Sequence, residues 1–185
     1  MACNSIRTFE YNPCIANLGG IKSVFLAEYD ADAIKVTKGE GGADDTYTLK
    51  KEGITWVEYK MRKNVASMTS TLNNSTDGAS YVTTELALVF SRMDAAKRAA
   101  IQALALGEVM AVVEDSNGEL WFLGKDAPLT ATAGAGETGT AMSDANRYTL
   151  TLTDESKEFP IRLADSDKPS PSPASSSNPS QTPGA

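Results

Sequence analysis

The chain has 185 residues, a formal net charge of −7 and no histidine. The length suits one domain with a real hydrophobic core. The lack of histidine excludes Ser-His-Asp and Cys-His catalysis and the common zinc sites, and the acidic balance argues against a protein that grips nucleic-acid phosphates. No apolar run approaches eighteen residues, so we expect no membrane insertion and, at the N-terminus, no secretory signal.

Residues 1–17 show no strong periodicity and are predicted to form an N-terminal arm. The two cysteines, Cys3 and Cys14, lie in this arm. Two cysteines are too few for a disulfide scaffold, and they lack further soft ligands for a metal. We therefore expect free thiols in a reducing compartment, with no metal and no cofactor.

Residues 18–163 form the predicted folded body, in which hydrophobicity follows a period of two. The stretches "IKSVFLAEY" (21–29) and "AIKVT" (33–37) predict an early pair of strands. A glycine-rich loop, 39–45, separates them from the strand "TYTLK", 46–50.

The next stretch, "TWVEYKMRK" (55–63), alternates and predicts a strand with one buried face. Val57, Tyr59 and Met61 would face the core, with Trp56, Glu58, Lys60 and Arg62 on the other face. The polar residues 64–79 predict a long loop. "YVTTELALVF" (81–90) alternates again and predicts a strand whose buried residues are Val82, Leu86, Leu88 and Phe90.

One helix is predicted, at about 92–106. Ser91 and Asp94 have the spacing of a capping box, and Gly107 is a usual C-terminal stop. Its apolar stripe, Ala100, Ile101, Leu104 and Ala105, should cover a sheet face, although a partner-binding helix is the alternative. Two apolar strands then flank Asn117-Gly118, which predicts a β-hairpin.

The motif "GAGETG" (134–139) matches G-x-G-x-x-G, the loop of dinucleotide-binding folds. Such a loop needs a helix after it to hold the pyrophosphate. Here Tyr148, Leu150 and Leu152 follow in strand alternation instead. We therefore predict that these glycines serve a turned loop, within 126–146, between two strands.

The C-terminal segment 164–185 changes character. Residues 165–185 hold five of the eight prolines and no apolar residue larger than alanine or proline. Such a segment cannot bury enough surface to offset its ordering entropy, so it predicts a flexible tail.

The order of these elements resembles the tail tube (major tail) proteins of tailed bacteriophages, in a form associated with phages of Bacteroidetes hosts. The similarity covers about residues 50–163 and is carried by "YVTTELALVF", the capped helix, the hairpin "VMAVVEDSNGELWFLG", the loop "AGETGTAMSDAN" and the strand "RYTLTLT". The resemblance implies two packed antiparallel sheets, as a β-sandwich or barrel, with a flanking helix and long assembly loops.

The resemblance also implies a virion protein that forms stacked hexameric rings for DNA ejection. Its partners would be further copies of itself and other phage tail or connector proteins, with DNA passing the lumen without specific binding. It implies no catalytic residues. The expected assembly loops contain Gly39, Glu40, Gly41, Gly42, Asp44, Asp45, Asn73, Asn74, Gly134, Gly136 and Gly139, and Glu58 is a candidate lumen acid.

Three other functions remain open from the sequence. A head–tail connector, adaptor or tail-terminator ring can share the tube fold. A ligand-binding β-sandwich would need exposed aromatic platforms, for which only Trp56 and Trp121 are available among tryptophans. A carboxylate enzyme is the least favoured, because adjacent acids on one strand, such as Glu114 and Asp115, point to opposite faces.

Overall fold

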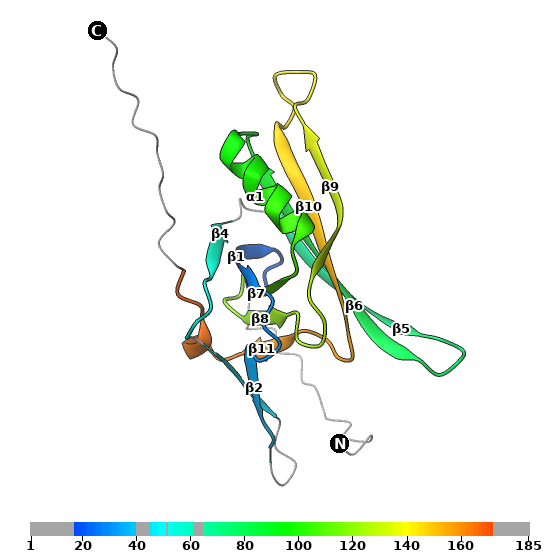
Figure 1. Cartoon of the computed structure of the whole chain (residues 1–185). Helices are drawn as coiled ribbons and strands as arrows, with labels where there is room; N and C mark the ends of the chain where they lie inside the picture. Colours follow the sequence, from blue (N-terminus) through cyan, green and yellow to red (C-terminus); the bar gives the residue numbers. More distant parts are fainter. Residues whose placement is uncertain (1–16, 40–44, 51, 61–64, 172–185) are drawn as a thin grey trace.

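A computed structural model describes residues 17–39, 45–50, 52–60 and 65–171 (Figure 1). This part is mainly β, with antiparallel strands and a single α-helix. The strands are β1 (Ile21–Glu28), β2 (Ile34–Thr37), β3 (Thr46–Leu49), β4 (Val57–Lys60), β5 (Ser67–Asn74), β6 (Ser80–Ser91), β7 (Val109–Asp115), β8 (Leu120–Leu123), β9 (Thr130–Glu137), β10 (Arg147–Ser156) and β11 (Ile161–Leu163); the helix is α1 (Ala95–Leu106).

Two sheets pack face to face, as the resemblance implies. The five-stranded sheet has the order β11-β8-β7-β1-β4, and the four-stranded sheet has the order β5-β6-β10-β9. Between them lies a core in which Leu86 and Leu88 of β6 meet Val24 and Val113 of the other sheet. The predicted inward face of β6 is confirmed, because Val82, Leu86, Leu88 and Phe90 are all buried.

A second core covers the far face of the five-stranded sheet. It contains Phe25, Val112 and Phe122, with Trp56 and the hairpin β2–β3 over them. Central strands β1 and β7 are therefore covered on both faces, which explains why they are buried almost continuously instead of alternately. The Asn117-Gly118 hairpin is confirmed between β7 and β8, with Gly118 at a positive φ of 91°.

Two predicted details of the early strands are wrong. β1 and β2 do not pair with each other: β1 lies between β7 and β4, and β2 pairs with β3. Both edges of β1 are taken by longer-range partners, so β2 forms its own small sheet. In the 55–63 stretch, Trp56 is buried because it belongs to the second core. Val57 is 45% exposed, because β4 lies at a sheet edge. Met61 and Arg62 lie outside the described residues.

Two predicted loops contain strands. Residues 64–79 hold β5, and residues 126–146 hold β9, including Gly134 and Gly136. Both are edge strands that pair along their whole length with a longer neighbour. Their small and polar side chains carry little hydrophobic alternation, so pairing with the neighbour decides their conformation more than their own pattern does.

The helix is confirmed, but it starts later than predicted. Asp94 is its N-cap and accepts a hydrogen bond from the Lys97 N–H at 2.8 Å, whereas Ser91 ends β6. Arg92 has a φ of +65° in the turn between them. Ile101 and Leu104 pack against the core between the sheets, but no residue of α1 is fully buried.

Candidate functional site

The four-stranded sheet has two free edges within the described part of the chain. The edge strands are β5 and β9, each eight residues long. β5 has no charged residue, and Glu137 is the single charged residue of β9. Natural proteins usually protect sheet edges with charges, proline or very short strands, and these two edges have little such protection.

The two edges run in opposite directions. Each neighbouring pair in the order β5-β6-β10-β9 is antiparallel, and the number of strands is even. A second copy related by rotation alone would therefore place its β5 antiparallel to the β9 of the first. Such a contact joins two different surfaces, so it closes into a ring when the rotation divides a full turn.

One face of this sheet packs on the core, and the other is open. Register and alternation place these residues on the open face: Ser67, Thr69, Thr71, Asn73, Tyr81, Thr83, Glu85, Ala87, Val89, Thr132, Ala133, Ala135, Glu137, Arg147, Thr149, Thr151, Thr153 and Glu155. Threonine and other small residues dominate. Arg147 forms an ion pair with Glu137, while Glu85 and Glu155 are exposed and unpaired among the described residues.

The motif glycines have structural reasons of their own. A Cβ on Gly136 would lie 2.8 Å from Cε1 of Tyr148, and Gly139 has a φ of +73°. The Asp144 carboxylate accepts hydrogen bonds from the Thr140 and Ala141 N–H groups, each at 2.8 Å. These bonds to Ala141 and Thr140 lower the pKa of Asp144. Gly139 thus lies in a turn between β9 and β10, as predicted, whereas Gly134 and Gly136 belong to β9 and not to the predicted loop.

The predicted assembly residues do not converge. The Gly39 N–H donates to Asp45 Oδ1 at 3.1 Å at the β2–β3 hairpin, whereas Glu40, Gly41, Gly42 and Asp44 lie outside the described residues. Asn73 and Asn74 belong to β5, where Asn73 donates to Thr83 Oγ1 at 2.8 Å. The β2–β3 hairpin, the β5–β6 hairpin and the β9–β10 turn extend from the body in three directions (Figure 1).

The candidate lumen acid Glu58 lies on β4 of the five-stranded sheet, where its Oε2 is 3.9 Å from Lys60 Nζ. The open face of the four-stranded sheet instead carries Glu85 and Glu155, which the sequence reasoning did not single out. The sequence contained a signal for Glu85, since it alternates with the buried residues Leu86 and Leu88 of the predicted strand 81–90.

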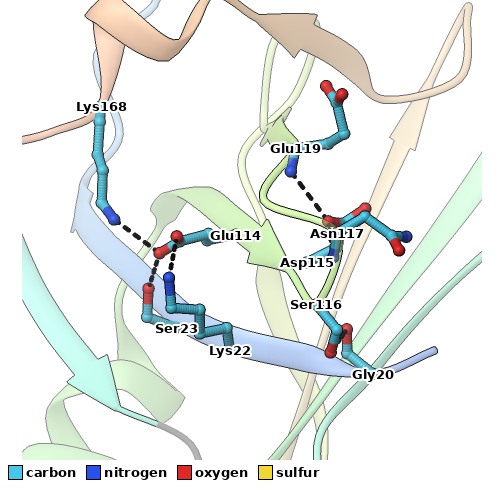
Figure 2. A network of polar contacts seen from close by, with 9 residues as sticks. All are labelled: Gly20, Lys22, Ser23, Glu114, Asp115, Ser116, Asn117, Glu119 and Lys168. Carbon is cyan, nitrogen blue, oxygen red and sulfur yellow. Dashed lines mark hydrogen bonds and ion pairs between the residues drawn. The ribbon is translucent and has the colours of Figure 1, made fainter. Parts of the chain in front are cut away.

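A buried carboxylate joins three parts of the chain on the far face of the five-stranded sheet (Figure 2). Glu114 of β7 accepts hydrogen bonds from Lys22 Nζ at 2.7 Å, Ser23 Oγ at 2.8 Å and Lys168 Nζ at 2.7 Å. Burial opposes its ionisation, but the hydrogen bonds from Lys168, Lys22 and Ser23 outweigh burial and lower the pKa of Glu114 to about 2.

Lys168 belongs to the stretch whose composition predicts a flexible tail. Residues 165–171 are described, and they begin with a short 3₁₀ turn, Asp165–Asp167. Asp167 and Pro169 are buried, and the Lys168 ammonium lies 5.7 Å from the centroid of the Phe25 ring. The chain therefore stays attached to the body beyond the predicted start of the tail.

Neither a metal site nor a membrane helix is found in the described part of the chain. Within the described ranges, no group of three or more Cys, Asp or Glu side chains is placed to hold a metal ion. No helix in those ranges is long and apolar enough to cross a membrane. No protein-family model matches the chain, and no curated protein is significantly similar to it.

Proposed function

We propose that the protein is a structural virion subunit that assembles into rings, hexameric by the resemblance, which stack as a phage tail tube. The observation that carries this proposal is the four-stranded sheet with two unprotected edges of opposite direction. Joining β9 of one copy to β5 of the next satisfies both rows of backbone N–H and C=O groups and continues the sheet around a ring.

The open face then becomes the wall of the lumen. Its small, polar threonines offer a passing DNA molecule few apolar or cationic contacts. Three carboxylates, Glu85, Glu137 and Glu155, stand against the single guanidinium of Arg147, which gives the face a formal charge of −2. An acidic wall repels phosphates, so DNA would move through it without binding.

A proline on the β5 edge tests the proposal. The Ser75 N–H donates to the Ala79 carbonyl, so alternation along the ladder turns the N–H of Leu72 to the free edge. Leu72→Pro removes that donor and no bond to β6, whereas Leu72→Thr keeps it. We expect electron microscopy to show rings or tubes for the wild type and Leu72→Thr, and monomers with unchanged circular dichroism for Leu72→Pro. Assembly by all three proteins alike would contradict edge pairing.

The same images separate the alternative functions. Single closed rings that never stack would favour a head–tail connector, adaptor or tail terminator. A monomer at every concentration would favour the ligand-binding β-sandwich. Against that module, Trp56 belongs to the second core and Trp121 packs against the first, so neither tryptophan forms an exposed aromatic platform.

A further inference from the structure

An apolar groove of about 570 Å³ opens between α1 and β4. Leu26 and Val109, at the end of β1 and the start of β7, lie in its lining. Tyr59 of β4 lines it from the sheet side, and Ala103 and Leu104 line it from the helix. The groove borders the amphipathic helix, which leaves Leu104 only partly buried.

The groove borders a free sheet edge and an acidic rim. β4 is the last strand of the five-stranded sheet and pairs only with β1 in the described part of the chain. Val57 of β4 lines the groove and is 45% exposed. Glu28 and Glu108 line it too, are exposed, and form no ion pair within the described ranges. These features suit an extended segment with apolar side chains and a cation.

We propose that this groove receives the N-terminal arm, residues 1–16, of a copy in the adjacent ring; this inference rests on the proposed function. The arm is long enough, because sixteen extended residues span roughly 50 Å. It carries Ile6, Phe9, Tyr11 and Ile15 as apolar side chains. Its charged side chains are Arg7, a cation for the acidic rim, and one acid, Glu10.

The direction of the arm favours a neighbouring copy. Asn117 fixes the base of the arm at the start of β1: the Leu18 N–H donates to its Oδ1 at 2.8 Å, and its Nδ2 donates to the Leu18 carbonyl at 3.1 Å. The groove lies at the other end of β1, about 26 Å away for eight strand residues. β7 and β4 occupy both edges of β1, so the arm of the same copy cannot fold back and pair with that strand. Copies stacked head to tail bring the arm of one to the groove of the next.

The natural thiols of the arm provide a test in the full-length chain. Cys3 and Cys14 are its two cysteines, so a single Val57→Cys substitution adds the one thiol of the groove. Mild oxidation of assembled tubes should then produce a ladder of disulfide-linked multimers on a non-reducing gel. The exposed Lys157→Cys, outside the groove, is the matched control. Docking of the arm raises the effective concentration of its thiols at the groove, so we expect roughly tenfold more cross-linking for Val57→Cys than for Lys157→Cys.

Each outcome decides the inference. A ladder that disappears when Cys3 and Cys14 are replaced by serine supports it. Equal cross-linking in both variants, or an intrachain disulfide without multimers, overturns it. Tubes that form without a cross-link overturn the placement of the arm and leave the proposed function standing, whereas a chain that never assembles overturns both. Ala103→Cys, across the groove on α1, repeats the test if Val57→Cys fails to fold.

Discussion

At the scale of single residues, Glu114 shows how the fold holds a buried charge. Its side chain is only 7% exposed, yet two lysines and Ser23 bind it. A buried carboxylate is unfavourable alone and becomes favourable only when hydrogen bonds compensate for the lost hydration. The pKa of Glu114 is lowered, because these hydrogen bonds stabilise the carboxylate by more than burial destabilises it.

Glu114→Gln should therefore lower the free energy of unfolding at pH 7. The pKa falls from a usual 4.5 to about 2 in the folded protein, and both lysines are substantially exposed to solvent, so we expect a loss of about 2 kcal/mol. A lowered folded-state pKa gives stability that is complete above pH 4.5 and is lost as pH falls toward 2. Urea unfolding of both proteins across this range should show their difference shrinking with acid. The exposed Glu52→Gln is the control, and a constant difference would refute the charge-based explanation.

Gly134 and Gly136 form a matched pair on β9. A Cβ at Gly136 would lie 2.8 Å from the Tyr148 ring, whereas at Gly134 the nearest atom, the Thr149 carbonyl oxygen, is 3.5 Å away. Gly136→Ala should thus cost about 1–2 kcal/mol through displacement of the ring. Gly134→Ala should be neutral or slightly stabilising, because alanine loses less backbone entropy in a strand. Thermal unfolding of the two variants compares them directly, and equal melting temperatures would contradict the crowding at Tyr148.

At the scale of elements, the N-terminus of α1 differs from the prediction, because the N-cap is Asp94 and not Ser91. The Asp94 side chain accepts from the Lys97 N–H, and contacts from Lys97 lower its pKa. Asp94→Ala should speed amide exchange in the first helical turn and lower the melting temperature. Ser91→Ala should leave the helix unchanged, since Ser91 ends β6. Faster amide exchange in the Ser91 variant than in the Asp94 variant would contradict this assignment and support the predicted capping box that begins at Ser91.

The elements that the sequence predicted correctly are those with a strong local signal. β6, β10 and the β7–β8 hairpin each contain a regular apolar pattern or a specific turn. β5 and β9 were missed because edge strands of threonine, serine, alanine and glycine have hydrogen bonds to a neighbour as their main constraint. The groove could not be predicted from the sequence either, because β4 and α1 are far apart in the chain and come to line the same groove only in the folded protein.

At the scale of the whole molecule, the C-terminal segment divides into two parts. Residues 165–171 contribute Lys168 to the Glu114 network and bury Asp167 and Pro169. A chain ending at residue 164 should lose about 2–3 kcal/mol of unfolding free energy, because Glu114 loses its Lys168 partner and the packing of Asp167 and Pro169 on the body is lost as well. A chain ending at residue 171 should retain wild-type stability, given the proline- and serine-rich composition beyond it. Chemical denaturation distinguishes them, and equal stability of both truncated chains would show that the 165–171 contacts contribute nothing.

The proposed lumen makes the charge of the open face a property of the whole assembly. Glu85→Lys together with Glu155→Lys changes the formal charge of that face from −2 to +2, since each substitution adds two units. Repeated around a ring, this change should turn a wall that repels phosphates into one that binds them. Purified tubes of the double variant should then retain DNA at low salt and release it as salt rises. The control Asp32→Lys with Glu52→Lys makes the same change in net charge at exposed positions outside that sheet. Equal DNA retention by the two double variants would mean that net charge alone is responsible and that the open face does not line the lumen.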